Sequence, residues 1–311
     1  MKIWFDILTP KQYLFFEYFI QKLKKHHKII STSRKYEQVN GIRKFGLVNP
    51  IIIGKHGGKN NINKLLASLD RSKLLTKKIE KDKPDLLLSF CSPEASRVSY
   101  GLGIPHISFS DSPHAKTVMK LSLPYVTKLL IPWVIPKDDF KEFGINSHDI
   151  IQYRSIDAGV IIRNYKEKNK KKSSQKKIIL IRPEESEAAY IHKKSITKKV
   201  IEKIIMDFPD EEKIVLSRYK EQSSDLKKIF GKEIKILSKP VYGKEILSNV
   251  DCFIGSGGTM TAEAGLLGIP TISLNVVPNR IEDYLVKNKI IFRSESPNRI
   301  SREVFQVLNN N

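Results

Sequence analysis

The stretch Asp251-Cys-Phe-Ile-Gly-Ser-Gly-Gly-Thr-Met-Thr-Ala-Glu-Ala-Gly-Leu-Leu-Gly-Ile-Pro270 decides the fold, because it has the pattern of strand, glycine-rich turn, helix and next strand. Cys252 to Ile254 form a short apolar run of the kind found in buried parallel strands. Gly255 to Gly258 allow a tight turn and close approach to the backbone. Thr259 to Leu267 can form a helix whose first amides face that turn, and such amides bind anions.

The side chains around this turn suit a nucleotide that carries a diphosphate. Ser256 and Thr259 add hydroxyls, and Glu263 follows about one helical turn later, where a carboxylate can bridge two vicinal ribose hydroxyls. The predicted nucleotide-sugar site therefore contains Gly255, Ser256, Gly257, Gly258, Thr259 and Glu263. On this interpretation Gly257→Val abolishes binding while the protein stays folded. The alternative is that the glycines only make a tight turn and Glu263 is a solvated helix residue.

A second segment, Asp85-Leu-Leu-Leu-Ser-Phe-Cys-Ser-Pro-Glu-Ala-Ser-Arg-Val-Ser-Tyr-Gly-Leu-Gly-Ile-Pro105, repeats this pattern from the opening aspartate to the closing Gly-Ile-Pro. The two copies lie about half a chain apart, which suits two similar α/β domains in tandem. We predict an α/β fold with two Rossmann-like domains whose parallel sheets face a cleft. The expected domains are residues 1–163, which hold the acceptor, and residues 178–311, which hold the nucleotide sugar. Residues 164–177 form a charged, apolar-poor linker or, alternatively, a tether to membrane or nucleic acid.

Composition narrows the partners. The net charge of +22, from 55 Lys and Arg against 33 Asp and Glu, favours an anionic partner or reflects a lysine-rich proteome. The lysines are scattered and form no nucleic-acid module, so anionic lipid headgroups explain the charge at least as well as nucleic acid, and no nucleic-acid partner is expected. No segment resembles a transmembrane span or a signal peptide, which predicts a cytoplasmic protein with peripheral contact at the inner membrane face. The only cysteines, Cys91 and Cys252, exclude a disulfide framework and a cysteine-rich zinc site.

Candidate catalytic residues follow the predicted strands of the first domain, where parallel sheets place their ligands. Asp111 and His114 are the first choice for the acid–base set, Asp6 and His56 the second, and Glu94 is a further candidate. Each residue also has a structural interpretation. Asp111 can cap the helix that follows it, and His114 can be a surface residue. Asp6 can hold the interdomain loops, and His56 can shape a turn. Glu94 can be a carboxylate in the first turn of a helix, where the helix dipole stabilises it.

The predicted site needs cations for its diphosphate. Arg182, Arg218 and Lys220 follow second-domain strands and are the expected charge partners. No Asp-x-Asp motif lies at a strand end, since Asp138-Asp139 marks the start of a helix. A helix dipole and basic side chains can stabilise a diphosphate leaving group, so we predict that no metal and no cofactor takes part.

The chain resembles the archaeal and bacterial family catalogued as domain of unknown function 354, which is similar to the two-domain glycosyltransferase B fold. The resemblance covers nearly the whole chain and rests on Trp4-Phe-Asp6 with Phe15-Phe16, Gly54-Lys-His-Gly-Gly58, Ser92-Pro-Glu-Ala95, Asp111-Ser-Pro-His114, Arg182-Pro-Glu184, and Gly255-Ser-Gly-Gly-Thr-Met260 with Glu263. The family has no settled reaction. The resemblance thus implies a fold and a ligand class, a UDP-sugar or related nucleotide sugar, more strongly than a reaction.

Two characterised enzymes are similar in parts of the chain. In the transferase that adds N-acetylglucosamine to a lipid-linked peptidoglycan precursor, a Ser-Gly turn precedes a ribose-binding glutamate by seven positions, as Ser256 precedes Glu263. The non-hydrolysing UDP-N-acetylglucosamine 2-epimerase resembles the chain around Asp85 and Gly103-Ile-Pro105. Its catalytic acid falls near Ser92 or Pro93 here, and Asp111 is one position from its glutamate, which argues against epimerase activity.

Three functions remain open from the sequence. The first is a metal-independent transferase that moves a sugar from a nucleotide to an acceptor, which could be lipid-linked, with a sugar-nucleotide 2-epimerase as its alternative. The second is a non-catalytic nucleotide-binding or assembly protein. The third is a nucleic-acid binder that uses the charge alone.

Overall fold

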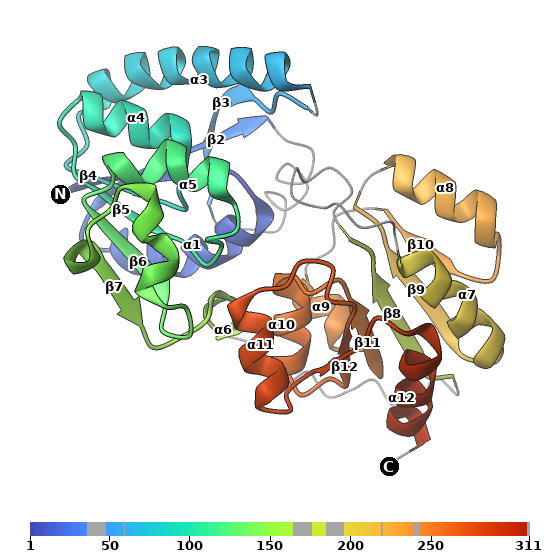
Figure 1. Ribbon diagram of the computed structural model, residues 1–311. Coiled ribbons are helices and arrows are strands. Elements are labelled where there is room, and N and C mark those ends of the chain that lie inside the picture. The colour runs from blue at the N-terminus through green and yellow to red at the C-terminus, as the bar shows by residue number, and fades with distance from the viewer. Residues whose placement is uncertain are drawn as a thin grey trace. The chain divides into compact units, whose positions relative to one another are not determined.

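The computed structural model describes residues 1–35, 48–58, 60–163, 176–184, 196–218, 220–238 and 243–309. The chain divides into two compact units, Met1–Asp157 and Ala158–Asn311, and each contains one parallel sheet (Figure 1). Residues 164–175 of the predicted linker lie outside the described residues. Within the described residues, no helix is long and apolar enough to cross a bilayer.

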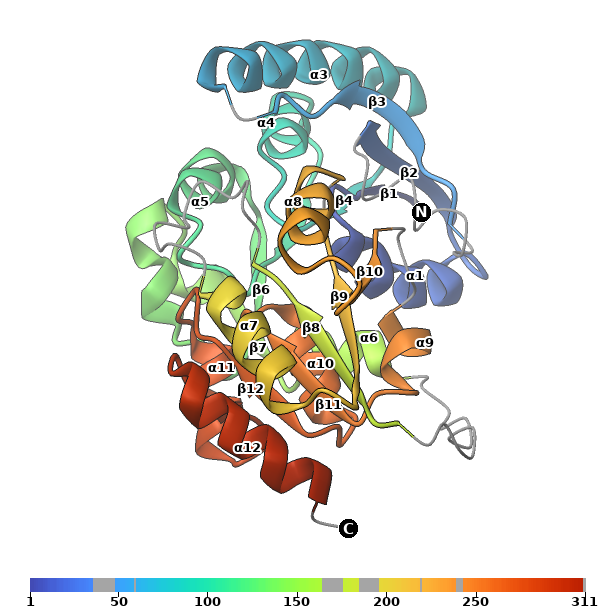
Figure 2. The same ribbon diagram turned by 90° about the vertical axis from the view of Figure 1, so that its right-hand side faces the viewer.

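The first unit has a seven-stranded sheet in the order β3-β2-β1-β4-β5-β6-β7. Its strands are β1 (Lys2–Asp6), β2 (Lys28–Lys35), β3 (Ile51–Lys55), β4 (Leu86–Ser89), β5 (His106–Phe109), β6 (Lys128–Pro132) and β7 (Ile150–Tyr153). Its helices are α1 (Pro10–Leu23), α3 (Asn61–Asp82), α4 (Pro93–Gly101) and α5 (Lys116–Ser122), with 3₁₀ turns η1 (Leu123–Tyr125), η2 (Lys137–Phe143) and η3 (Ser147–Asp149). Helices α3 and α4 pack side by side (Figures 1 and 2).

The second unit has a six-stranded sheet in the order β10-β9-β8-β11-β12-β13. Its strands are β8 (Ile178–Arg182), β9 (Glu212–Leu216), β10 (Lys235–Leu237), β11 (Cys252–Gly255), β12 (Thr271–Ser273) and β13 (Phe292–Arg293). Its helices are α7 (Thr197–Asp207), α8 (Lys220–Phe230), α9 (Gly243–Leu247), α10 (Thr259–Leu266), α11 (Arg280–Lys287) and α12 (Pro297–Asn309), and α6 (Asp157–Ile162) starts at the boundary of the units.

Apolar residues of the central strands form the core of each unit. In the first, Trp4 and Leu87 pack with Leu75 and Ile79 of α3, and all four are completely buried. In the second, the core includes Ile179, Val215 and Ile254 from three adjacent strands. Strands buried on both faces need such continuous apolar runs, which is why they could be recognised in the sequence.

The internal repeat predicted from the sequence is confirmed by equivalent backbone contacts. Asp85 accepts a hydrogen bond from the Lys2 amide at 2.7 Å, and Asp251 accepts one from the Ile178 amide at 2.8 Å. The two Gly-Ile-Pro segments also correspond in their backbone contacts. The carbonyls of Pro105 and Pro270 accept hydrogen bonds from the amides of Leu87 and Phe253, each at 2.9 Å. The chain therefore has the predicted two-domain α/β fold.

The strand order reverses between β1 and β4 in the first unit and between β8 and β11 in the second. Open parallel sheets bind ligands outside the carboxyl ends of strands at such a switch point. In the first unit this point lies between Asp6 and Ser89, which are register partners. In the second it lies between Arg182 and Gly255, which are also partners.

Some elements differ from the sequence prediction. The apolar run from Val126 to Ile131 predicts a strand from its first residue, but β6 begins at Lys128, because Leu123–Tyr125 first form a 3₁₀ turn around Pro124. Strand β7 was not predicted from the sequence. Strands β10 and β13 were not predicted either, because they have only three and two residues, respectively. Asp138 and Asp139 lie in the first turn of η2, so the predicted helix start is confirmed as a 3₁₀ helix.

Candidate functional site

The glycine-rich turn joins β11 to α10 at the switch point of the second sheet. Gly258 is the N-cap residue of α10, and within the described part of the chain no side-chain cap hydrogen bond forms there. The first amides of a helix have no acceptor inside the helix itself, so those of Thr259 and Met260 are directed out of the N-terminus. This end of α10 can therefore offer amides to an anion.

The glycines of the turn differ in what a side chain would meet at each position. At Gly255, a Cβ would lie 2.3 Å from Thr261 Oγ1 and 2.5 Å from the Phe253 ring. At Gly257, φ is +95° and a Cβ would lie 2.2 Å from Glu282 Oε2. At Gly258, a Cβ would meet nothing within 4 Å. Only Gly258 thus adjoins open space.

This arrangement corrects the expectation that Gly257→Val leaves the fold intact. The Gly257 amide donates to Thr261 Oγ1 at 3.3 Å, so it is turned toward the protein. A valine at this position would need a positive φ and would collide with the Glu282 carboxylate. A substitution there perturbs folding as well as binding.

Glu263 is the fifth residue of α10, and the turn hydroxyls of Ser256 and Thr259 flank the start of the helix. Glu263 is buried, and a Cβ at Gly243 would lie 3.2 Å from its Oε2, so the neighbouring chain passes close to the carboxylate. Ser256 is buried and its carbonyl accepts the Val276 amide at 3.3 Å, while Thr259 is half-buried at the first position of the helix.

Glu282 of α11 was not identified from the sequence. Its Oε1 accepts a hydrogen bond from Ser273 Oγ at 2.7 Å and lies 3.0 Å from Arg293 Nε. Its Oε2 is buried against Gly257 and has no hydrogen-bond partner among the described residues. Burial raises the pKa of Glu282, although Ser273 and Arg293 oppose the shift. No local pattern marks this residue, because its partners come from three other elements.

The predicted cations occupy different places. Arg182 is the register partner of Gly255, and its Nη1 donates to the carbonyls of Leu216 at 3.0 Å and Ser217 at 3.3 Å. Arg218 donates through Nε to the Pro183 carbonyl at 3.2 Å, so the two arginines join the loops after β8 and β9. Lys220 is exposed at the start of α8.

The first unit has an equivalent turn after β4, but side chains close it. Cys91 has a positive φ of 46°, as Gly257 does in the second unit. Ser92 is the N-cap of α4, where Gly258 caps α10. The Ser92 hydroxyl accepts the Ala95 amide at 3.4 Å and donates to Asp6 Oδ2 at 2.7 Å. The helix N-terminus of the first unit is therefore satisfied internally.

The charges at the two switch points are opposite. Asp6 ends β1, whereas Arg182 ends the equivalent strand β8. Asp6 is completely buried and accepts hydrogen bonds from Thr32 Oγ1 and Arg71 Nη2, both at 2.6 Å. The first switch point thus carries a carboxylate that is already paired with Arg71, whereas the second carries a cation at the equivalent strand end.

Arg71 of α3 is a buried cation that the sequence reading missed. Its guanidinium donates to the Ile53 carbonyl at 3.1 Å and reaches Asp6 at 2.6 Å and Glu94 Oε2 at 3.4 Å. Burial alone would lower the pKa of Arg71, but Asp6 and Glu94 raise it above its ordinary value. A Cβ at Gly54 would lie 2.9 Å from Arg71 Cβ, so this glycine leaves room for the arginine. Arg71 thus brings together two predicted catalytic residues.

Asp111 belongs to a second charged cluster. Lys11 Nζ forms an ion pair with Asp111 and lies 2.6 Å from Asp157 Oδ2. The Tyr153 hydroxyl donates a hydrogen bond to Asp157 Oδ1. Burial raises the pKa of Asp157 to about 6, while Lys11 overcomes the effect of burial and lowers that of Asp111. Lys11 and Asp157 were not among the predicted site residues. Lys11 lies 100 residues before Asp111 and Asp157 lies 46 residues after it in the chain, so no local spacing reveals them.

The two histidines lie in different places. Burial lowers the pKa of His114, with Asp111 opposing the shift. His56 Nδ1 accepts the Gly58 amide at 3.1 Å in the loop after β3. Because β3 is the edge strand and four strand spacings of about 4.8 Å separate it from β5, His56 follows a strand roughly 19 Å from the one that precedes Asp111.

A family and several solved structures match this architecture. The model of the family described as "Protein of unknown function (DUF354)" matches residues 1–311. The chain belongs to this family. An uncharacterised protein of Methanocaldococcus jannaschii is 29% identical over 300 residues, which cover 88% of this chain and 81% of that protein.

The solved structures show the fold. The UDP-GlcNAc 2-epimerase of Neisseria meningitidis bound to UDP-GlcNAc has a TM-score of 0.77 at 15% identity, covering 98% of this chain and 91% of that one. The M. jannaschii UDP-GlcNAc 2-epimerase in complex with UDP-GlcNAc and UDP has 0.75 at 18%, covering 100% and 94%. The glycosyltransferase of kitacinnamycin has 0.62 at 13%, covering 99% and 91%. The family member described here thus has a glycosyltransferase B-like fold.

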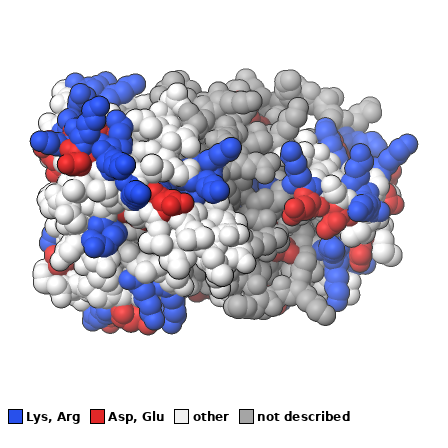
Figure 3. Space-filling model, turned by 90° about the horizontal axis from the view of Figure 1, so that it is seen from above, with Lys and Arg blue, Asp and Glu red and all other residues white. Residues whose placement is uncertain are grey.

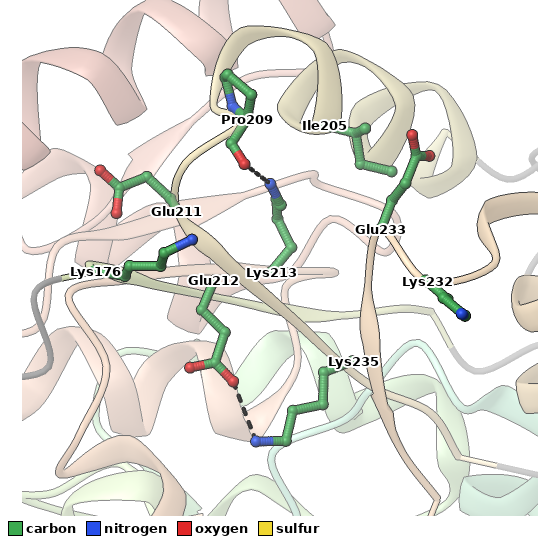
Figure 4. A pocket seen from close by; sticks show the side chains of 9 residues that line it. All are labelled: Lys176, Ile205, Pro209, Glu211, Glu212, Lys213, Lys232, Glu233 and Lys235. Atoms are coloured by element: carbon green, nitrogen blue, oxygen red, sulfur yellow. Dashed lines mark hydrogen bonds and ion pairs between the residues drawn. The ribbon is translucent and has the colours of Figure 1, made fainter.

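A cavity of about 440 Å³ lies elsewhere in the second unit. Its lining includes Lys213, Glu212 and Lys235, and Figure 4 shows Lys213 directed at the Pro209 carbonyl and Lys235 paired with Glu212. Glu212 is the first residue of β9, so this cavity is at the amino ends of the strands, opposite the glycine-rich turn. Among the described residues, no three His, Cys, Asp or Glu side chains are grouped to hold a metal ion.

Proposed function

We propose that the chain binds a nucleotide-activated sugar at the β11–α10 turn and transfers the sugar to an acceptor without a metal ion. The observation that carries this proposal is the contrast between the two equivalent turns. The second unit has an uncapped helix N-terminus beside Arg182, whereas the first has a capped one beside Asp6. Only the former combination favours a diphosphate.

In this proposal the first amides of α10 and the Arg182 guanidinium hold the diphosphate. The same groups would stabilise its additional charge when it leaves the sugar, which is the task a metal ion performs elsewhere. Glu263 would accept hydrogen bonds from the ribose hydroxyls. Two of the structural relatives hold UDP-GlcNAc, and one of them also holds UDP, which supports this ligand class.

Asp111 would act as the general base on an acceptor hydroxyl, with Asp157 as its partner. Two carboxyl groups that share Lys11 have pKa values moved in opposite directions, and such pairs supply an acid and a base at one pH. Lys11 keeps Asp111 ionised and oriented. His114, which is close enough to Asp111 to be influenced by its charge, would relay the proton.

A sugar-nucleotide 2-epimerase is the second candidate. It is favoured by the higher TM-scores of the epimerases, 0.75 to 0.77, compared with 0.62 for the glycosyltransferase of kitacinnamycin. Against it, Ser92 stands near the position of the catalytic acid and its hydroxyl is already used to cap α4.

Titration calorimetry with UDP, GDP, ADP and TDP tests the binding step, and Gly258→Ser is the decisive variant. Serine there copies Ser92 of the first unit, so it should cap α10, keep or slightly raise stability, and weaken diphosphate binding about tenfold or more. Gly268→Ser is the control for binding only, because Gly268 also adjoins open space but follows the other end of α10. Its φ of +75° means that a serine there lowers stability, while nucleotide affinity should be unchanged. Nucleotide binding that is absent in the wild type, or unchanged in Gly258→Ser, would contradict the assignment.

Product analysis with labelled nucleotide sugars then separates the reactions. Transfer releases the nucleoside diphosphate in proportion to glycosylated acceptor, while epimerisation exchanges the proton on sugar C2 with solvent deuterium. Nucleotide binding without either outcome would favour a binding or assembly protein.

A further inference from the structure

The outer face of α3 carries four exposed aliphatic side chains. Ile62, Leu65, Leu66 and Leu69 are between 54% and 68% exposed. Their spacing of three and four residues places them on one face of the helix. We call these four residues the α3 apolar stripe.

The α3 apolar stripe is not needed to hold the helix on the first unit. Ala67, Arg71, Leu75 and Ile79 are buried on the opposite face, each four residues after the last. Helix α3 therefore already has a complete packing face against β3 and α4. Clustered aliphatic side chains on a second, exposed face are typical of an interaction surface.

Lysines continue the same face toward the end of the helix. Lys73, Lys77 and Lys81 are exposed, and among the described residues none of the ion pairs includes them. The exposed acids of this helix are Asp70 and Glu80, so these three lysines exceed the acids by one charge. Figure 3 shows basic side chains bordering uncharged surface on the first unit.

We infer that α3 docks on an anionic lipid bilayer, with the apolar stripe in the headgroup region and the lysines against the lipid charge. A helix with aliphatic residues beside lysines fits such an interface. A second copy of the chain fits less well, because each copy carries a net charge of +22 and the stripe covers only about two helical turns. Stable protein interfaces bury roughly 800 Å² on each partner.

Vesicle flotation tests the inference with the full chain and without nucleotide. The wild type should bind phosphatidylcholine vesicles that contain about 30% phosphatidylglycerol. Addition of 0.5 M salt shortens the electrostatic screening length on the order of fivefold from its value at low salt, so it should weaken that binding. Leu66→Asp with Leu69→Asp should lower the vesicle partition coefficient at least about tenfold. Lys73→Gln with Lys77→Gln should lower it about 25-fold on anionic vesicles only, since each lysine near such a surface adds about a fivefold preference.

A matched control separates the stripe from general surface hydrophobicity. Met206→Asp with Phe305→Asp makes the same change in charge at two comparably exposed apolar residues of the second unit. In this control variant, vesicle binding should fall by less than about threefold. Circular dichroism and nucleotide affinity should be unchanged in every variant. The nucleotide site and the lipid surface are thus tested by separate measurements.

Two results would overturn the inference. One is a wild-type protein that does not bind anionic vesicles, or a stripe variant that binds them like the wild type. The other is sedimentation showing that Leu66→Asp with Leu69→Asp converts a dimer into monomers without changing vesicle binding, which would assign the stripe to a second copy of the chain.

Discussion

Gly257→Ala should destabilise the second unit through a defined collision. The residue has φ of +95°, and a Cβ would lie 2.2 Å from Glu282 Oε2. A non-glycine residue in a strained backbone region costs about 1–3 kcal/mol, and forcing extra atoms into a packed site costs about another 1–3 kcal/mol. The expected loss is therefore about 2–6 kcal/mol.

Thermal unfolding followed by circular dichroism measures this loss. A domain of about 150–250 residues loses about 2–4 °C per kcal/mol, so the transition of the second unit should fall by at least about 4 °C. Gly258→Ala is the control, because its Cβ would meet open space at a φ of −88°, and it should shift the transition by less than about 2 °C.

A double-mutant cycle identifies the colliding group. In the Glu282→Ala background, Gly257→Ala should cost about 1–3 kcal/mol less than in the wild type, because the clash with Oε2 is gone and only the backbone strain remains. Equal costs in both backgrounds would refute the contact between Glu282 and Gly257. A loss below about 1 kcal/mol in the wild-type background would refute the whole account of this glycine.

Three further changes test the remaining groups. Glu263→Gln should weaken binding of a ribonucleoside diphosphate by about 1–3 kcal/mol in calorimetry but leave a 2′,3′-dideoxy nucleotide unaffected, and equal losses for both would mean that Glu263 does not contact the ribose. Asp111→Asn should reduce turnover about 10²–10⁴-fold with nucleotide affinity unchanged, whereas Asp138→Asn, an exposed control, should keep full activity. Burial raises the folded-state pKa of Asp157 to about 6. The folded protein thus binds more protons than the unfolded chain between about pH 4 and 6, and stability should fall as pH rises through this window. Asp157→Asn should remove that fall in urea titrations, and an unchanged slope would place the titration elsewhere.

The fold could be predicted because its strands are buried on both faces and its two halves repeat one pattern. Asp85 and Asp251 each accept a hydrogen bond from a backbone amide at an equivalent position, so the repeat in the sequence reflects a repeat in hydrogen bonding. The glycine-rich turn could be located for the same reason. The sequence reading could not tell which glycines face the protein, since that depends on Glu282, which reaches the turn from α11.

Buried ionic contacts explain most of what the sequence reading missed. Lys11, Asp111 and Asp157 come from separate loops and helix ends, and their pKa shifts exist only when the chain has folded around them. Arg71 is the exception. It occupies one position of the series Ala67, Arg71, Leu75 and Ile79 on the buried face of α3, and an arginine in such a series needs a buried acid as partner.

The two units show how one fold can hold different chemistry at equivalent positions. A serine and an aspartate close the first turn, and Arg71 pairs with the carboxylates of Asp6 and Glu94 beside it. At the second turn, a glycine leaves the N-terminus of α10 without a side-chain cap, and Arg182 ends the neighbouring strand. A diphosphate placed at the first turn would meet Asp6 without available amides, whereas at the second it would meet Arg182 and uncapped amides. In the proposed function these differences place the diphosphate in the second unit, so exchanging Ser92 and Gly258 should weaken nucleotide binding at the second turn by capping α10.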